Sequence, residues 1–347
     1  MPGQHRSRAV AAVTALAGAL LAASVLIAAP LTPKPAASAA SQPNQVITVQ
    51  ASTSTSTTAR LDLWQRSSLG GFWHAAGPVT AYVGHQGVGQ ASEGLGRTPA
   101  GVFGLTQAFG NQPNNGTRLP YFQAGRNDWW SSNVSSPNYN THVVQATSPG
   151  RASENLYYTG PVYAHAVVID YNRFPVVPGA GSAFFLHIAN GQPTLGCVAV
   201  DSASLDSIMR WLTPTAHPVI SIGVGSQATS IITRANAAAA LHNPKGYLDS
   251  AAGGRGSVRA TGWAADPDLP SYPVKVDVYI DGRMRGRFST GVARPDVAAA
   301  VHVGPDQGFA VTVGSVARGA HTVCVYALNL RLGTGNPRLG CRTVTVS

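Results

Sequence analysis

The chain has 347 residues, of which only 11% are charged, while glycine (38) and proline (24) are plentiful. This composition excludes a long-helix protein and favours short strands joined by turns, with room for two domains. The formal net charge is +10, but the arginines are scattered singly, without a basic stripe or a recognisable nucleic-acid module. Nucleic acid is therefore excluded as the expected partner, whereas an anionic cell envelope suits a basic protein.

Residues 1–40 have the pattern of a signal peptide. Arg6 and Arg8 precede an uncharged run over 9–29, and Ala-Ser-Ala at 37–39 offers a small-x-small cleavage site. The alternative is an uncleaved membrane anchor, because the run is just long enough to span a bilayer, which takes about 20 residues. In both cases we expect the remaining chain to work outside the cytoplasm, secreted or in the cell wall. Membrane contact is expected only through this segment, if it is uncleaved.

Residues 41–60 are predicted to form a disordered linker. The tract from Ala51 to Thr58 alternates serine and threonine and cannot bury apolar surface.

Residues 61–225 are predicted to form the first domain, which is mainly β. Apolar runs separated by turn residues indicate its strands at Val79–Val83, Ala164–Asp170, Ala183–His187 and Val219–Val224. One helix is predicted directly after a Gly-Cys turn at Cys197, capped by Asp201 or Ser202 and ended by Pro214. Its apolar residues recur at helical spacing, at Leu205, Ile208, Met209 and Leu212.

Residues 226–245 are predicted to be a connector that contains a short helix over Ile231–Leu241. Residues 246–347 then form an all-β accessory module, expected to be an immunoglobulin-like β-sandwich. Val274–Ile280 alternates strictly and runs into Asp281-Gly282, which favours a hairpin turn. Further strands are predicted at Phe309–Val313, His321–Ala327 and Arg342–Val346.

The chain has three cysteines. Cys324 and Cys341 each lie on the strand face opposite the valines, so both point away from the predicted core and could pair across neighbouring strands. Such a disulfide would contribute about 3 kcal/mol by loop-closure entropy. The alternative is a bond from Cys197 to one of them, which would leave an odd cysteine in the module. If Cys197 stays unpaired in an exported protein, a chemical use is indicated.

Cys197 and His187 are the candidate catalytic pair. An adjacent imidazole and a helix N-terminus both favour the reactive thiolate. His187 ends a predicted strand, and the predicted helix starts just after Cys197. Gly196 lets the backbone approach a substrate carbonyl, so that amides around Gly196 and Cys197 can form an oxyanion hole. The alternative is a buried unpaired cysteine beside a core histidine, and spacing alone does not separate the two.

Two motifs follow one another along this domain. Thr-Pro-Ala-Gly-Val-Phe stands at 98–103, and His187 precedes Pro-Thr-Leu-Gly-Cys-Val at 193–198. They resemble the Thr-Pro-x-Gly-x-Phe strand, and the histidine with its Ser/Thr-x-Gly-Cys turn, of the L,D-transpeptidase catalytic domain, also called the YkuD-like domain. The resemblance covers roughly residues 75–225. It implies a β-rich catalytic domain with one or two helices that acts on the peptide stems of bacterial peptidoglycan.

The resemblance also implies roles for single residues. Cys197 would be the nucleophile and His187 its general base, oriented by the backbone carbonyl of Ile188. Gly196 would form the oxyanion turn, and Thr194 would shape that turn and contact substrate.

One position departs from the family pattern. Two residues after the cysteine the family commonly has Arg or Asn, and here stands Ala199. Arg97 and Arg173 are candidates to replace the lost substrate contact. Trp130 is a candidate to line a substrate groove, with packing as the alternative.

The implied reaction is a two-step acyl transfer through a cysteine acyl-enzyme. Cys197 attacks the carbonyl at the L-centre of a diamino acid in a donor stem, D-alanine leaves, and the amine of a second stem forms the crosslink. Water in place of the amine would make the enzyme an L,D-carboxypeptidase, and a non-catalytic wall-binding protein is the third alternative. Carbapenem-type β-lactams are implied as inhibitors. No cofactor or metal is expected, because the histidines and cysteines lack metal-ligand spacing.

The C-terminal sequence resembles an accessory β module of exported actinobacterial proteins. The resemblance rests on Thr261–Asp268 and Val278–Gly282. Such a module could bind wall or glycan, or could serve as a spacer.

Overall fold

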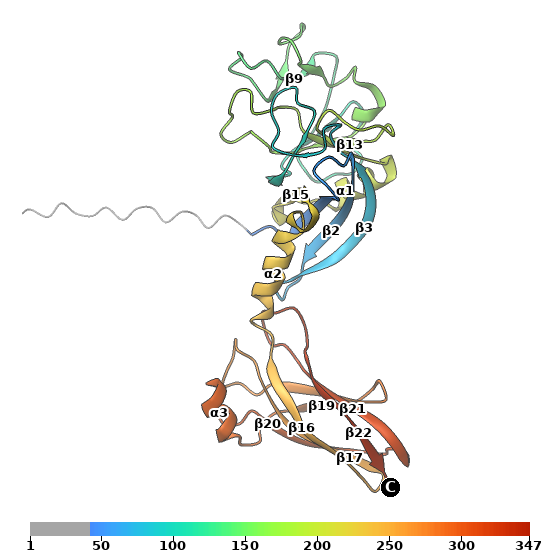
Figure 1. Cartoon of the computed structure of the whole chain (residues 1–347), viewed down its shortest axis with the longest axis vertical. Coiled ribbons are helices and arrows are strands. Elements are labelled where there is room, and N and C mark those ends of the chain that lie inside the picture. The colour runs from blue at the N-terminus through green and yellow to red at the C-terminus, as the bar shows by residue number, and fades with distance from the viewer. Residues whose placement is uncertain (1–41) are drawn as a thin grey trace, which may run out of the picture. The chain divides into compact units, whose positions relative to one another are not determined.

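The computed structural model describes residues 42–347. The predicted signal peptide or membrane anchor at residues 1–40 lies outside these described residues. The described part is mainly β, as predicted, with three α-helices among its strands (Figure 1). No helix between residues 42 and 347 is long and apolar enough to cross a membrane.

The first domain consists of residues up to about 227. Its strands are β1 (Gln45–Ala51), β2 (Thr58–Arg66), β3 (Phe72–Tyr82), β4 (Val88–Gly89), β5 (Thr98–Pro99), β6 (Gly101–Gly104), β7 (Ala108–Gly110), β8 (Tyr121–Gln123), β9 (Asp128–Ser131), β10 (Thr141–Val144), β11 (Glu154–Asn155), β12 (Ala166–Val168), β13 (Phe185–Ile188), β14 (Val198–Val200) and β15 (Val219–Val224). Its helices are α1 (Ser202–Trp211) and the short 3-10 turns η1 (Gly160–Tyr163), η2 (Pro214–Ala216) and η3 (Gly225–Gln227).

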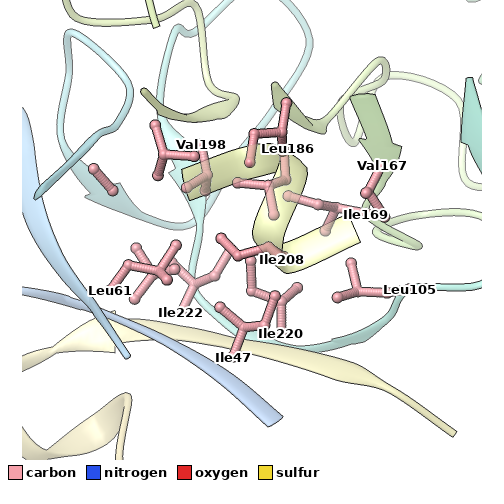
Figure 2. Packing of buried hydrophobic residues seen from close by; sticks show 14 of the residues in the cluster. Ile47, Leu61, Leu105, Val167, Ile169, Leu186, Val198, Ile208, Ile220 and Ile222 are labelled. Carbon is pink, nitrogen blue, oxygen red and sulfur yellow. The ribbon is translucent and has the colours of Figure 1, made fainter. Parts of the chain in front are cut away.

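One large sheet organises this domain, in the order β6-β15-β1-β2-β3-β14-β13-β12-β7-β8. The predicted spacing of α1 is confirmed, since Leu205, Ile208 and Met209 are buried. Figure 2 shows the core in which Ile208 packs among apolar side chains of β1, β2, β13, β14 and β15. The core thus fixes α1 against β13 and β14, the strands that flank the Cys197 turn.

The prediction of a disordered linker at residues 41–60 is wrong. β1 lies inside the sheet, bonded to β15 on one side and to β2 on the other. Its residues Val46, Ile47 and Val49 are fully buried. The Ser/Thr tract supplies only the turn between β1 and β2, in which the hydroxyls bond one another. Such a turn needs no apolar side chains, so its composition concealed the strand that precedes it.

The predicted connector helix is confirmed as α2 (Ser230–Ala240). The elements of the second domain are β16 (Lys245–Gly254), β17 (Ser257–Ala265), β18 (Lys275–Ile280), β19 (Arg283–Ser289), α3 (Pro295–Val301), β20 (Gly308–Gly314), β21 (Gly319–Ala327) and β22 (Arg338–Val346). They form a three-stranded sheet, β16-β17-β20, and a four-stranded sheet, β19-β18-β21-β22. Apolar residues of both sheets share one core, so the predicted β-sandwich is confirmed.

The predicted disulfide is also confirmed. Cys324 of β21 and Cys341 of β22 are directly opposite in the antiparallel register and are bonded to each other. Val323 and Val325, on the other face of β21, are fully buried. Cys197 is the free cysteine of the described chain.

Candidate active site

The first domain brings Cys197 and His187 to one face of its sheet. β13 and β14 are parallel neighbours, with His187 opposite Ala199. Side chains alternate between the two faces of a strand, so Cys197, two residues before Ala199, lies on the same face as His187. The ring of Tyr163 connects the pair, because it packs on His187 with 5.4 Å between ring centroids and belongs to the same buried cluster as Cys197.

Cys197 does not directly precede a helix, and this part of the prediction is wrong. β14 stands between the cysteine and α1, and the N-terminus of α1 is capped by Asp201, whose carboxylate accepts from the Ser204 N–H at 2.9 Å. A three-residue apolar strand fits between turn and helix and left no separate signal in the sequence.

The Cys197 thiol is buried rather than activated in this structure. Its side chain is 7% exposed, and Sγ donates to the Ala183 carbonyl and accepts from the Phe185 N–H, both at 3.4 Å. Burial raises the pKa of the thiol far above its ordinary value, the charge of Glu154 adds to this, and the Phe185 N–H and Tyr163 hydroxyl oppose it. The sequence-based expectation of a lowered thiol pKa is therefore wrong for this state, in which the thiol is neutral.

His187 is held as a neutral base. Its Nδ1 lies 2.9 Å from the carbonyl oxygen of Ile188, which is the contact that the family resemblance implies. A carbonyl can only accept, so Nδ1 carries the proton and Nε2 is left as an acceptor. Burial lowers the pKa of His187 below its ordinary 6.5, and the Ile188 carbonyl opposes this shift. At neutral pH the imidazole is thus uncharged and able to take a proton at Nε2.

Two threonine hydroxyls clamp the Cys197 peptide. The Cys197 carbonyl accepts from Thr194 Oγ1 at 2.7 Å and from Thr98 Oγ1 at 3.3 Å. The Gly196 N–H in turn donates to Thr194 Oγ1 at 3.0 Å. Gly196 has φ +134°, and a Cβ at this position would lie 2.6 Å from the Phe184 ring, so only glycine fits the turn. The Thr-Pro strand motif therefore acts at the cysteine itself, a role that the sequence did not reveal.

A tyrosine–glutamate pair lies next to the thiol and was missed by the sequence analysis. Tyr163, 4% exposed, donates its hydroxyl to Glu154 Oε2 at 2.5 Å. Burial raises the pKa of Glu154, and burial with the neighbouring Glu154 charge raises the pKa of Tyr163 well above its usual value. Glu154 comes from the two-residue strand β11 and Tyr163 from the 3-10 turn η1. Elements this short have no periodicity, so no sequence pattern could have found the pair.

A second tyrosine–glutamate pair bonds to the chain segment that contacts the thiol. Tyr139 donates to Glu93 at 2.5 Å, and Ser182 donates to the same carboxylate at 2.9 Å. Ser182 precedes Ala183, whose carbonyl accepts from Sγ. Burial and Glu93 raise the pKa of Tyr139 to about 12, and the charge of Glu93 contributes to the raised pKa of Glu154.

Three residues were predicted as candidates to contact substrate, and in the structure each of them has a different partner. Trp130 is 1% exposed, packs on Phe185 and donates to Asn140, so it is a core residue and the prediction of a groove-lining role is wrong. Arg97 donates to the Gln86 carbonyl, and Arg173 pairs with Asp170. Neither guanidinium bonds to Cys197 or His187 among the described residues.

The residue that does stand out at the turn is Leu195. This apolar side chain, directly between Thr194 and Gly196, is 81% exposed. In the Ser/Thr-x-Gly-Cys motif, Leu195 occupies the variable position x.

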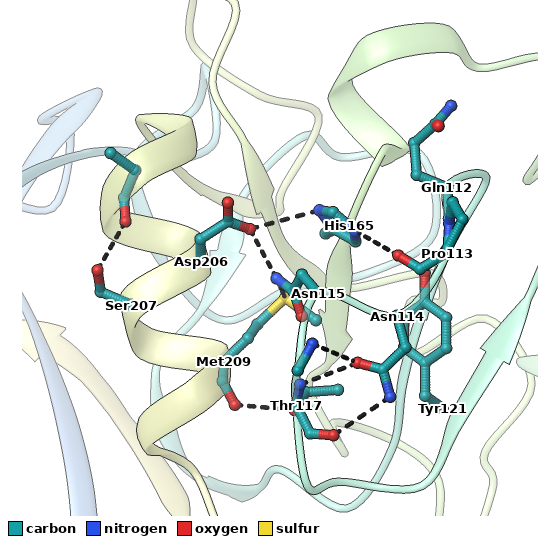
Figure 3. A network of polar contacts seen from close by, with 12 residues as sticks. Gln112, Pro113, Asn114, Asn115, Thr117, Tyr121, His165, Asp206, Ser207 and Met209 are labelled. Carbon is teal, nitrogen blue, oxygen red and sulfur yellow. Dashed lines mark hydrogen bonds and ion pairs between the residues drawn. The ribbon is translucent and has the colours of Figure 1, made fainter.

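His165, a histidine just before β12, has a structural role. Its Nε2 lies 2.9 Å from the Pro113 carbonyl, and its Nδ1 lies 3.4 Å from Asp206 of α1. Asp206 also accepts from Asn115, and Thr117 donates to the Met209 carbonyl (Figure 3). This network ties α1 to the loop before β8. No group of three or more potential metal-ligating side chains converges within residues 42–347.

Comparison with known proteins identifies a family for the first domain. Residues 57–221 match the family model described as the L,D-transpeptidase catalytic domain, YkuD. This segment of the chain therefore belongs to the YkuD family, and it contains Thr98, His187 and Cys197.

Other comparisons add little. A comparison with curated proteins gave no match. Among solved structures, the chain is similar to a lytic polysaccharide monooxygenase from Jonesia denitrificans, determined by neutron crystallography, at 17% identity and a TM-score of 0.19. That similarity covers 28% of this chain and 58% of the monooxygenase chain, and it is too low to bear on fold or function.

Proposed function

We propose that this protein is a peptidoglycan L,D-transpeptidase that crosslinks stem peptides through an acyl-enzyme on Cys197. The YkuD domain supports a peptidoglycan substrate in general. The observation that supports cysteine catalysis is the state of His187: a neutral imidazole whose Nδ1 proton is held by Ile188, on the same sheet face as the thiol.

In the first step, Cys197 Sγ attacks the carbonyl carbon at the L-centre of a diamino acid in the donor stem. Nε2 of His187 takes the thiol proton as the carbon–sulfur bond forms. Because burial keeps the thiol neutral, deprotonation accompanies the attack, as for a serine nucleophile, and does not precede it. The carbon–nitrogen bond then breaks, His187 gives the proton to the leaving amine of D-alanine, and a thioester remains.

In the second step, the side-chain amine of an acceptor stem attacks the thioester. His187 takes the amine proton, and the new amide forms as the carbon–sulfur bond breaks and Sγ regains a proton. Water at the same point would give the L,D-carboxypeptidase, which is the alternative function. The apolar surroundings of the thiol, formed by Phe185, Ala183 and Tyr163, favour transfer to an amine over hydrolysis.

The clamped turn would stabilise the oxyanion of both steps. Since the Gly196 N–H donates to Thr194, the Cys197 N–H is the donor that the turn leaves for a substrate oxygen. Thr98 and Thr194 act as positioning residues by fixing the Cys197 carbonyl and with it the neighbouring peptide units.

Two experiments test the proposal. Intact-mass analysis after incubation with a carbapenem should give one covalent adduct on the wild type and none on Cys197→Ala. A wild type without adduct, or an adduct that persists in Cys197→Ala, would exclude cysteine catalysis and favour a wall-binding protein. Product analysis with purified tetrapeptide stems then distinguishes crosslinked dimers from tripeptides, and tripeptides alone would identify the carboxypeptidase.

The same proposal locates the protein outside the cytoplasm, in the wall or secreted. Its support is the basic start and uncharged run of residues 1–29. Fractionation of cells that express the full chain tests this, because protein that stays in the cytoplasmic fraction would contradict it.

A further inference from the structure

The second domain carries a groove that the catalytic proposal does not use. It lies on the outer face of the four-stranded sheet and has a volume of about 330 Å³. Its lining residues are Asp277, Tyr279, Gly282, Cys324, Tyr326 and Asn336.

The pleat of the sheet explains why these side chains meet. On β18, Val276 and Val278 point into the core and are fully buried, so Asp277 and Tyr279 point outward. The register sets Asp277 opposite Tyr326 and Tyr279 opposite Cys324. Two neighbouring strands therefore present two tyrosines, one carboxylate and the disulfide side by side.

Tyr279 and Tyr326 form an aromatic wall with unused polar tips. Their ring centroids are 5.3 Å apart in an edge-to-face arrangement. Met284, opposite Tyr279 on β19, is 48% exposed and extends the apolar surface. Neither tyrosine hydroxyl has a hydrogen-bond partner among residues 42–347, so both can bond to a ligand. Tyrosine gives this kind of rigid, amphipathic contact at low entropic cost.

The polar groups of the groove carry no net charge. Asp277, 7% exposed, accepts from Arg287 Nε at 2.7 Å and Nη2 at 2.9 Å, which neutralises both groups. Asn336 comes from the loop between β21 and β22, and its Oδ1 accepts from the Asn329 N–H at 2.8 Å. This contact fixes the Asn336 amide and leaves its Nδ2 as a donor.

The groove is also preformed. The disulfide between Cys324 and Cys341 joins β21 to β22 beneath it, and the hairpin turn at Gly282 bounds it along the strands. A ligand would meet a surface that needs little ordering, which favours binding.

We propose that this groove binds an uncharged chain of pyranose sugars. A pyranose has an apolar C–H face, which fits the tyrosine rings and Met284, and a rim of hydroxyls, which fits the two phenols, Asn336 and the Asp277–Arg287 pair. None of the residues that line the groove is a cation, and the Asp277 carboxylate is neutralised by Arg287, so the groove itself favours an uncharged ligand. Lys275 and Arg338 lie on the same face of the sheet but outside the lining, and the salt dependence of binding separates their charge from contacts in the groove. The module is thereby a glycan-binding unit and not a spacer, independently of the chemistry at Cys197.

Calorimetric titration of the full chain with an N-acetylglucosamine hexamer tests the proposal. Tyr279→Ala and Tyr326→Ala should each weaken binding by about tenfold, in line with the loss of one aromatic contact. Tyr272→Ala is the matched control, since Tyr272 belongs to the same domain, is 59% exposed and does not line the groove. Tyr326→Phe keeps the ring and should weaken binding less than Tyr326→Ala. Raising the salt concentration should leave the wild-type affinity unchanged.

Three results would overturn the proposal. The first is a wild type that does not bind the hexamer. The second is a loss in Tyr272→Ala equal to that in Tyr279→Ala, which would locate binding outside the groove. The third is an affinity that falls with salt, which would indicate charge attraction. Acylation of Cys197 by a carbapenem should stay normal in Tyr279→Ala, so failure of this proposal is distinguishable from failure of the catalytic one.

Discussion

The hydroxyl of Thr98 lies 3.3 Å from the carbonyl oxygen of Cys197, across 99 residues of chain. The same hydroxyl accepts from the Gly84 N–H at 2.8 Å, so it connects the loop after β3 to the cysteine turn. Since Thr98 is fully buried, neither contact can be replaced by water.

We expect Thr98→Val to slow acylation about tenfold and to lower the free energy of unfolding by about 1–3 kcal/mol, because it leaves the buried Gly84 N–H without an acceptor and removes one of the two donors to the Cys197 carbonyl. Thr98→Ser keeps the hydroxyl and should retain most of the acylation rate. Stopped-flow acylation by a carbapenem, with urea unfolding in parallel, measures both effects. Equal rates in the wild type and Thr98→Val would show that the clamp does not position the nucleophile.

The pH profile of acylation should have its acid limb below pH 6.5. Burial lowers the pKa of His187, so the imidazole stays neutral, and competent as a base, into mildly acidic solution. As the pH falls through this lowered pKa, His187 gains a proton and the rate declines. An acid limb above pH 6.5, or a thiolate absorbance at neutral pH, would instead indicate a preformed thiolate–imidazolium pair.

Glu154 and Tyr163 should shift the reactivity of Cys197 in opposite directions. The charge of Glu154 raises the pKa of the thiol, and the Tyr163 hydroxyl lowers it. Glu154→Gln should therefore lower the thiol pKa and Tyr163→Phe should raise it. The pH dependence of alkylation by iodoacetamide gives the pKa directly. Shifts of the same sign in both variants would mean that they disturb the fold rather than the electrostatics.

A chain that begins at residue 57, where the family match begins, should not fold. It lacks β1, whose side chains Val46, Ile47 and Val49 are fully buried. Each contributes about 1.5–3 kcal/mol, and the total stability of a domain is about 5–15 kcal/mol. A chain that begins at residue 42 is the control and should give a cooperative thermal transition. A cooperative transition of equal midpoint in the shorter chain would contradict the position of β1 in the sheet.

The parts of the fold that follow from periodicity were predictable. The alternation of Val274–Ile280 gave β18, and the spacing of Leu205, Ile208 and Met209 gave α1. The cross-strand disulfide followed from the face on which each cysteine stands.

The parts that depend on tertiary packing were not predictable. Nothing in the sequence around Trp130 separates a surface aromatic from a core one, and the structure buries it. At the site, Cys197 and His187 came from a motif, but Glu154 and Tyr163 meet only through the folding of loops. The thiol pKa likewise depends on burial, which a local pattern cannot give.

The position of β1 has a consequence for how the first domain folds. Its Val46 pairs with Val219 of β15 in parallel register. The first strand of the domain therefore cannot complete its hydrogen bonds until the last strand is present. Contacts between residues so far apart slow folding and leave strand edges unpaired in the meantime. We therefore expect the domain to acquire its native sheet only once the whole stretch to Val224 has been synthesised, in a single late and cooperative step.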